Sequence, residues 1–326
     1  MRVIAEGRGP MLQPPDVNAF REWNRRKPKG LVDKRMSEGE AIRRFVHDGD
    51  YIGTELYGSV RAPMSLVREL IRQGRKGLRV AGQSVLEIDL LLGASMVTAT
   101  DFTYIGLELY GVSNVLRREV DSGNLAQIVE WSNAGLAWRF KAAAMGVPFL
   151  PMRSMLGTDT FNYSAAKVVE CPFTGDPIGL VPALILDAGL IHVHRADKYG
   201  NAQIDGISGF AYEMSRACRR LLLSTEQIVD TEVIRAKPDR TIIPYYLVDA
   251  VVEAPFGSHP GEMCYDYERD EPAIKEWVEA SKTVEGTHAY LDRYVYGLAG
   301  HDAYLELIGK QRLAELQAMV PGRGHE

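Results

Sequence analysis

The segment that most restricts the fold is residues 185–193 (ILDAGLIHV), which is almost uninterrupted in its apolar character. A strand that is apolar on both faces needs cover on both faces, and this is typical of strands inside a parallel sheet. Strand-like segments alternate along the chain with helix-like ones, and the alternation predicts an α/β fold with an open, doubly wound, mostly parallel sheet. The other strand-like segments are residues 51–54, 78–81, 96–105, 148–150 and 221–223.

Helix boundaries are marked by start and stop signals. A capping-box pattern at residues 37–40 (SEGE) begins a helix that ends near Gly49. Pro63 opens the next helix, which Gly74 ends. From residue 272 onward apolar residues recur at helical spacing, so we predict a helical C-terminal tail.

The chain has 326 residues, of which 46% are hydrophobic, so it can bury the core of a large α/β domain. Nothing in residues 36–326 resembles a linker, and we predict one domain over that range. Residues 1–35 contain several prolines and a basic cluster (RRKPK, 25–29) without apolar periodicity. We expect these residues to form a solvated arm that packs on a partner subunit rather than on nucleic acid.

Composition also narrows location and partners. The chain has no run of eighteen apolar residues and no apolar signal core at its start, so we expect no membrane span, no secretory signal and a cytoplasmic location. Cys171, Cys218 and Cys264 form no CxxC pair, which favours reduced thiols over a zinc site or disulfides. The net charge of −5 disfavours nucleic acid as a partner but leaves room for a local basic pocket for a polyanionic cofactor.

Two heptapeptides in the chain are nearly identical: residues 52–58 (IGTELYG) and residues 105–111 (IGLELYG). The flanking sequences differ, which argues against a repeat array. Each copy follows a predicted strand and precedes a helix, and such strand ends share the edge of the sheet where ligands bind. We therefore predict two loops of one site. Glu55 and Glu108 would then be either an acid/base pair or solvated loop residues.

Several ordered blocks resemble the A (alpha) subunit of family I coenzyme A transferases of the glutaconate CoA-transferase type. The blocks are residues 61–74, 111–120, 142–159, 248–260 and 265–277, and the similarity covers nearly everything from Ser37 onward. The resemblance implies a CoA-transferase-like fold and a B (beta) subunit of similar fold, with each active site formed by both. It also implies a heterotetramer or larger assembly, acyl-CoA and carboxylic acid substrates, and coenzyme A as a substrate with no permanently bound cofactor.

In that family a B-subunit glutamate within a Ser/Glu-Glu-Asn-Gly motif attacks the thioester, and this chain contains no Glu-Asn-Gly. The A subunit contributes a Gly-x-Gly-Gly-Phe loop whose backbone N–H groups stabilise the oxyanion. The first heptapeptide aligns with that loop, but Glu55, Leu56 and Tyr57 replace Gly-Gly-Phe. Backbone donors need only a permitted φ, so the oxyanion hole could persist or be lost. With Glu108, these three residues are the candidate catalytic residues.

The resemblance leaves alternatives open. Ring-opening hydrolases of steroid catabolism share the scaffold and use an A-subunit glutamate that aligns near Asn133, so its counterpart is absent here. Glu130, Glu55 or Glu108 could replace it. Decarboxylases are a further variant, and a noncatalytic partner subunit is the alternative outside enzymes.

The candidate residues for binding substrate or coenzyme A lie in three segments. Arg153 could hold a carboxylate or a phosphate, or could form a buried ion pair with Asp159. The full set is Gly53, Thr54, Gly58, Arg61, Asn133, Arg153, Gly157, Thr158 and Asp159. His192 and His194 share a strand face but lack an evident third ligand, so we expect hydrogen-bonded histidines and no metal. For residues 259–264, which include Glu262, we expect a structural turn.

Overall fold

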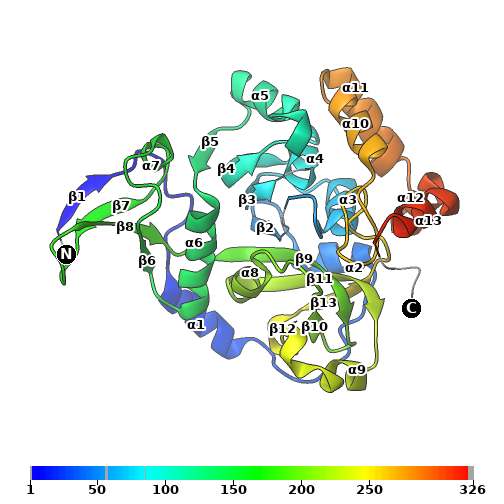
Figure 1. Cartoon of the computed structure of the whole chain (residues 1–326), viewed down its shortest axis with the longest axis horizontal. Helices are drawn as coiled ribbons and strands as arrows, with labels where there is room; N and C mark the ends of the chain where they lie inside the picture. The colour runs from blue at the N-terminus through cyan, green and yellow to red at the C-terminus, as the bar shows by residue number, and fades with distance from the viewer. Residues whose placement is uncertain (1, 56–57, 85, 322–326) are drawn as a thin grey trace.

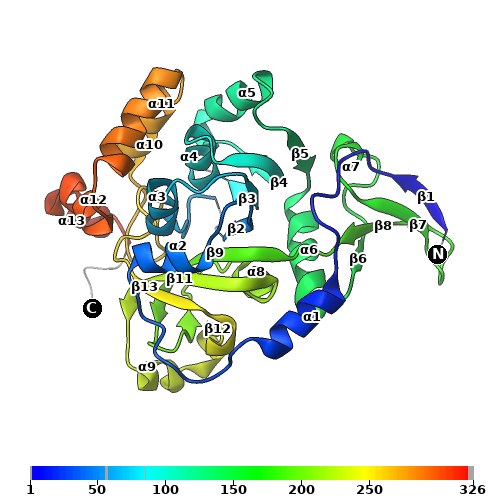
Figure 2. The ribbon, with the colours of Figure 1, turned by 180° about the vertical axis from the view of Figure 1, so that it is seen from behind.

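The computed structural model describes residues 2–55, 58–84 and 86–321, and its central feature is a nine-stranded sheet (Figures 1 and 2). Its parallel strands follow one another in the order β13 (Ala250–Glu253), β11 (Cys218–Ile228), β9 (Leu186–Ala196), β2 (Tyr51–Glu55), β3 (Leu78–Ser84), β4 (Val97–Ile105) and β5 (Gln127–Glu130). The fully apolar segment is therefore a central strand, β9. The predicted α/β fold with a mostly parallel sheet is confirmed.

A short antiparallel ribbon continues the row of β2. β10 (Ala202–Gln203) pairs with the last residues of β9, and β12 (Thr241–Ile243) pairs with β10. Because β11 pairs with β9 over nearly its whole length, β10 must use the same edge of β9 as β2 does, beyond the end of β2. Residues 204–210, which follow β10, therefore lie beyond the carboxyl end of β2.

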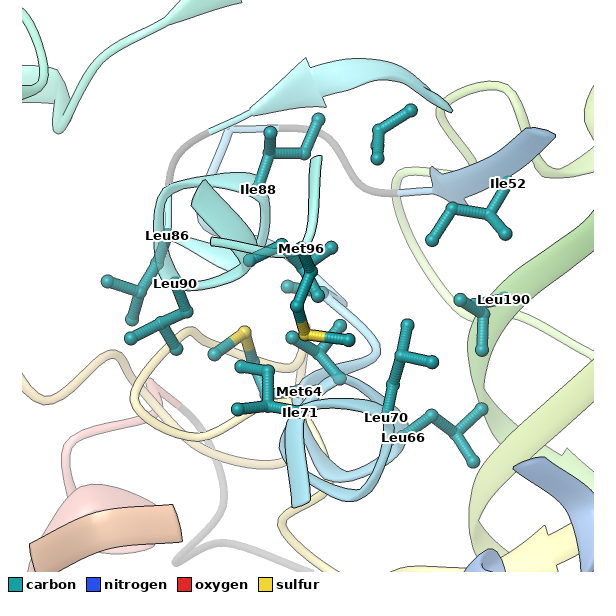
Figure 3. Packing of buried hydrophobic residues seen from close by; sticks show 14 of the residues in the cluster. Ile52, Met64, Leu66, Leu70, Ile71, Leu86, Ile88, Leu90, Met96 and Leu190 are labelled. Atoms are coloured by element: carbon teal, nitrogen blue, oxygen red, sulfur yellow. The ribbon is translucent and has the colours of Figure 1, made fainter. Parts of the chain in front are cut away.

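Helices cover both faces of the sheet (Figure 1). One face is covered by α2 (Glu38–Phe45), α3 (Met64–Arg72), α4 (Glu87–Gly93) and α5 (Asn114–Asp121); the other is covered by α1 (Val17–Arg26), α6 (Asn133–Met145) and α8 (Ala211–Arg216). Each face of the sheet packs against its helices to form a hydrophobic core, and strand side chains alternate between these two cores. Ile52 and Leu190 face α3 and α4 (Figure 3), whereas Tyr51 and Ile191 face α6. The predicted start of α2 is confirmed, because the Glu40 N–H donates to the Ser37 hydroxyl at 3.2 Å.

A second, four-stranded antiparallel sheet extends from one side of the molecule (Figure 1). Its order is β1 (Val3–Glu6), β7 (Lys167–Glu170), β8 (Pro177–Pro182) and β6 (Phe149–Met152), and α7 (Asp159–Asn162) connects β6 to β7. The prediction that residues 148–150 continue the parallel alternation is wrong, because they enter β6 of this sheet. Pro151 explains the placement: a residue without an N–H suits an edge strand, and β6 is an edge strand.

The N-terminal arm lies against its own chain. Val17 and Phe20 of α1 are buried in the core beneath α6. The Lys27 side chain is 6% exposed, and its ammonium forms an ion pair with Asp249 at 2.6 Å and donates to two backbone carbonyls at 3.0 and 2.6 Å. The carbonyls belong to Arg219 and Leu247. Contact of the arm with a partner subunit, and the boundary at residue 35, remain predictions.

The C-terminal tail is helical, as predicted. It comprises α10 (Glu271–Ala280), α11 (Val284–Leu291), a π-helical turn (Asp292–Tyr296), α12 (His301–Ile308) and α13 (Lys310–Ala318). The remaining short helices are α9 (Thr231–Ala236), η1 (Glu108–Tyr110), η2 (Pro238–Arg240) and η3 (Tyr245–Leu247). Trp277, Tyr290 and Tyr304 bury the tail against the α3 and α4 face. Within the described ranges no helix is long and apolar enough to cross a membrane.

Candidate active site

The carboxyl ends of β2 and β4 bring the two heptapeptides to one edge of the sheet, and their loops touch. A β-carbon built on Gly58 would lie 3.2 Å from Oε1 of Glu108. Gly58 has φ +60° and Glu108 has φ +51°, so both loops turn through the left-handed region where they meet. The structure therefore brings the two predicted loops together.

The second loop closes on itself. The Leu107 N–H donates to the Gly111 carbonyl at 2.8 Å, which leaves Glu108 and Leu109 at the tip of the loop. The Glu108 side chain is exposed, and Leu109 is 79% exposed. Of the two predicted carboxylates, Glu108 is thus the one in contact with solvent.

Side chains of α4 and of the C-terminal helix α10 hold this loop in place. Tyr110 donates its hydroxyl hydrogen to Glu271 of α10, and Ser113 donates to Asp89 of α4. The Trp277 indole N–H also donates to Asp89, at 2.6 Å. Burial raises the pKa of Asp89 to about 6, although both hydrogen bonds favour its charged form. The C-terminal tail therefore helps to position the Glu108 loop.

The first loop presents no free carboxylate at Glu55, whose side chain is fully buried. Its carboxylate accepts hydrogen bonds from Arg61 Nη1 at 2.9 Å and Arg61 Nη2 at 3.2 Å, and from the Phe210 N–H at 2.9 Å. Leu56 and Tyr57, the other predicted catalytic residues of this loop, lie outside the described residues. In this conformation Glu55 contacts the protein interior rather than the edge of the sheet.

Arg61 is buried as completely as Glu55. Its side chain also donates to the carbonyls of Ile207 at 2.9 Å and His192 at 3.1 Å, and its backbone N–H donates to the carbonyl of Glu262 at 2.9 Å. Arg61 has φ +61°, which is unusual for a residue with a side chain. The predicted binding role of Arg61 would require this network to open.

Glu262 joins the site although sequence reasoning assigned it to a structural turn. Its backbone is bonded to the first loop, since the Glu262 N–H donates to the Ser59 carbonyl at 3.1 Å. Burial raises the pKa of the Glu262 carboxyl; Arg269 opposes the rise, and nearby carboxylates, including Glu108, add to it. The spacing of residues 259–264 was the available signal, but it could not show that Glu262 lies near Glu108.

Gly53 and Thr54 support the loop from inside the sheet. A β-carbon on Gly53 would lie 2.3 Å from Leu186 Cδ1, so close packing requires glycine there. The Thr54 hydroxyl donates to Glu87 Oε1 at 3.3 Å. Glu87, at the start of α4, also lines a small cavity of about 10 Å³ beside Gly58. These predicted binding residues are buried beneath the loop.

The remaining predicted residues form a second cluster at the end of β5. The segment 153–159 lies over the start of α6: the hydroxyls of Ser132 and Ser154 are 3.4 Å apart, and a β-carbon on Gly135 would lie 3.0 Å from Met155 Sδ. Asn133 is the first residue of α6. Gly157 has φ +74°, the Thr158 hydroxyl caps α7, and Asp159 is the first residue of that helix.

Arg153 is exposed in this cluster. Within the part of the chain that the structure describes, its guanidinium makes neither a hydrogen bond nor an ion pair, so the expected alternative of a buried pair with Asp159 is wrong. The β5 cluster lies three strands from the end of β2, roughly 14 Å at the usual strand spacing. The predicted residues thus share one edge of the sheet in two clusters.

The two strand histidines have internal partners. His192 contacts Ser224 at 2.8 Å and Glu226 at 2.7 Å. His194 contacts the Cys264 carbonyl at 2.8 Å, and burial lowers its pKa to about 4, so it is neutral near pH 7. No group of three or more His, Cys, Asp or Glu among the described residues could hold a metal ion.

The model of the family described as coenzyme A transferase matches residues 35–254, more than half of the chain. The chain belongs to the coenzyme A transferase family. A relative from Archaeoglobus fulgidus, described as an uncharacterized protein, is 48% identical over 97% of this chain and 72% of its own length. The A subunit of glutaconate CoA-transferase from Acidaminococcus fermentans is 33% identical over 90% of this chain and 97% of its own length.

The solved structure of glutaconate coenzyme A-transferase from Acidaminococcus fermentans superposes with a TM-score of 0.85 at 30% identity, over 89% of this chain and 96% of that chain. A cholesterol ring-cleaving hydrolase IpdA subunit from Rhodococcus jostii is 29% identical over 88% of this chain and 98% of its own length. The predicted family and fold are therefore confirmed, and the sequence matches favour the transferase type over the hydrolase type.

Proposed function

We propose that this chain is the A subunit of a heteromeric CoA-transferase that moves coenzyme A between an acyl-CoA and a carboxylic acid. The observation that carries the proposal is the inward orientation of Glu55: the strand-end carboxylate that replaces a family glycine is held by Arg61 and is not available as a nucleophile. The attacking glutamate then comes from the B subunit, and coenzyme A is a substrate rather than a resident cofactor.

The reaction divides between the two subunits. The B-subunit carboxylate attacks the thioester carbonyl, the coenzyme A thiolate leaves, and an acyl-glutamyl anhydride forms. The thiolate then attacks the glutamyl carbonyl of the anhydride, which releases the first carboxylic acid and leaves a glutamyl-CoA thioester. The acceptor carboxylate then attacks the glutamyl-CoA thioester, and the same steps in reverse give the new acyl-CoA and the free B-subunit glutamate. Backbone N–H groups of residues 54–57, of which Leu56 and Tyr57 lie outside the described residues, stabilise the oxyanion at each addition.

The β5 cluster serves substrate binding in this proposal. Arg153 is exposed and has no partner among the described residues, so its guanidinium is free to bind a substrate carboxylate or a coenzyme A phosphate in bidentate geometry. Arg153→Lys keeps the charge and loses the bidentate geometry. We expect it to raise the KM of one substrate about tenfold while leaving kcat nearly unchanged.

The experiment is a CoA-transfer assay with the B subunit from the same source, with acetyl-CoA as donor and mono- and dicarboxylic acids as acceptors. We expect transfer by the assembled complex and none by either chain alone. Transfer by the isolated chain at the rate of the complex would contradict the division of labour, and thioester hydrolysis without transfer would contradict the reaction.

A hydrolase is the second candidate, favoured by the position of Glu108. Its exposed carboxylate lies against Gly58, near the half-buried Glu262, at the edge where the family's chemistry takes place. A general base there would activate water. Glu108→Gln separates the two functions: it should lower a hydrolytic or carbon–carbon cleaving activity by about 10² or more and change CoA transfer by less than about tenfold.

A further inference from the structure

We propose that Glu55 and Arg61 act as a positioning pair: their buried ion pair holds Arg61 against the end of β2 and fixes a second loop, residues 205–210, against both. This inference rests on the proposed function for its catalytic consequence, and on geometry alone for its structural one. It assigns both residues a role other than contact with substrate. It also adds residues 205–210 to the two heptapeptide loops as a third loop of the site.

The pair joins four segments of the chain. Glu55 ends β2, and Arg61 lies in the loop that leads to α3. The Phe210 N–H donates to Glu55 Oε1 at 2.9 Å, and Arg61 Nε donates to the Ile207 carbonyl at 2.9 Å, so both members of the pair bind the loop after β10. The fourth segment is β9, through the His192 carbonyl.

The orientation of the guanidinium is fully determined by these contacts. Nε, Nη1 and Nη2 all donate hydrogen bonds, and two of the bonds form a bidentate contact with one carboxylate. A planar fork of this kind fixes both distance and angle, which a lysine ammonium cannot do. The network therefore holds the backbone of Arg61 at φ +61°, a conformation that the chain would otherwise avoid.

In the sequence, the pair flanks two of the residues whose backbone N–H groups we propose as oxyanion donors. The described residues 58–60 lead directly into Arg61, whose N–H donates to the Glu262 carbonyl while the Glu262 N–H donates to the Ser59 carbonyl, so this end of the loop is fixed. Where the family has two adjacent glycines, this chain has at Glu55 a side chain that ties the loop to the interior. The ion pair thus holds the end of β2 and Arg61 together, which a glycine at residue 55 could not do.

Substitutions of both residues separate a positioning pair from a general base. Glu55→Gln leaves the buried Arg61 charge uncompensated, and Arg61→Met does the same to Glu55, whereas the double variant removes both charges. For a positioning pair we expect each single variant to lower kcat of the assembled complex about 10²-fold at nearly unchanged KM, and the double variant to lower it little further, because each change already breaks the same contact. For a general base at Glu55, Arg61→Met keeps the carboxylate and should lose much less turnover than Glu55→Gln.

Two further variants keep the test decisive. Arg61→Lys keeps the charge and the fold but not the bidentate contact, and should also lower kcat. The matched control is the exposed pair Arg235 and Glu232 on α9, whose side chains are 2.7 Å apart; Glu232→Gln should change nothing. Rates are compared per assembled complex, so that a loss of folded protein is not counted as a loss of turnover.

Hydrogen exchange gives a readout that does not depend on activity. In the isolated chain, Glu55→Gln and Arg61→Lys should accelerate amide exchange in residues 58–62 and 205–210 together, with little change in residues 153–159. If this occurs while the wild-type complex shows no CoA transfer, the proposed function fails and the positioning pair stands. Unchanged exchange in both loops, or a much smaller loss of turnover in Arg61→Met than in Glu55→Gln, overturns the inference.

Discussion

The Glu108 carboxylate lies against the α-carbon of Gly58, with only 3.2 Å between Oε1 and the place where a β-carbon on Gly58 would be. The two residues do not occupy corresponding places in the two heptapeptides, since Glu108 is the fourth residue of its copy and Gly58 is the seventh. The copies therefore pack against each other as unlike partners. Their similarity does not extend to the glutamates, because Glu55 is the buried last residue of β2 whereas the exposed Glu108 begins a 3-10 helix at φ +51°.

Gly58→Ala tests this contact. Alanine is disfavoured at φ +60° by about 1–2 kcal/mol, and its methyl group would also displace the Glu108 carboxylate. Gly123→Ala is the matched control, because Gly123 has φ +75° and no atom within 4 Å of a built β-carbon. We expect both variants to lose similar backbone stability in urea unfolding, but only Gly58→Ala to lose about tenfold or more in turnover. Equal turnover of the two variants would show that the contact is dispensable.

Asp89→Asn should change the pH dependence of stability. The folded-state pKa of Asp89 is raised from 3.8 to about 6, so its contribution is present below pH 4 and is lost as the pH rises through 6. The shift corresponds to about 3 kcal/mol. Asparagine can accept from Trp277 through its carbonyl oxygen and donate to the Ser113 hydroxyl through its amide, which reverses the Ser113 bond, and it does not titrate. Relative to the wild type, the variant should therefore gain stability between pH 4 and pH 7 in denaturant unfolding.

Asp302→Asn, on the exposed surface of α12, is the control for that experiment. Its unfolding free energy should follow the wild-type profile at every pH. Parallel profiles for Asp89→Asn and the wild type would refute the assignment of a raised pKa.

His194→Gln should reduce acid sensitivity. Burial lowers the folded-state pKa of His194 to about 4, so its contribution is complete above pH 6.5 and is lost as the pH falls toward 4. Glutamine can keep both the donor to Cys264 and the acceptor for the Asp205 N–H. The wild type should lose about 3 kcal/mol more than the variant between pH 7 and pH 4. The exposed residue His288 gives the control, and His288→Gln should leave the profile unchanged.

Lys27→Met should lower stability and spare turnover. Lys27 binds at the starts of β11 and β13, at the opposite edge of the sheet from the loops of the site. Removing its ammonium leaves Asp249 and two carbonyls without this donor, which should cost about 2–4 kcal/mol in thermal or urea unfolding. Lys29→Met, at an exposed neighbouring position, should cost almost nothing. A fall in kcat of the folded Lys27→Met complex would show that the arm reaches the site.

The central sheet could be predicted because its signals are local. The apolar run of β9 requires cover on both faces, and Ser37, Pro63 and Gly74 mark helix boundaries wherever the helices pack. The small sheet had no such signal. Its strands are four to six residues long, and β1 pairs with β7 across about half of the chain, so no local pattern indicated the partner.

The site was predictable as far as the edge of the sheet. The rule that parallel strands end at one edge placed both heptapeptides correctly. It did not place Asn133, which was named from the resemblance, or Arg153, which follows a strand of the antiparallel sheet. The orientation of Glu55 was not accessible, because it depends on hydrogen bonds with Phe210, 155 residues away, and through Arg61 with Ile207. The role of Glu262 near Glu108 was hidden for the same reason.

The arm has a consequence for biosynthesis. Lys27 and Asp249 are 222 residues apart, and β1 needs residues 167–170 as its partner strand. At a translation rate of about 5–20 residues per second, roughly 10–45 s pass between the synthesis of Lys27 and that of Asp249. During that interval Lys27 has no carboxylate partner, although α6 and β7, which cover α1 and pair with β1, are made earlier, so the basic end of the arm stays open to chaperones until Asp249 has left the ribosome.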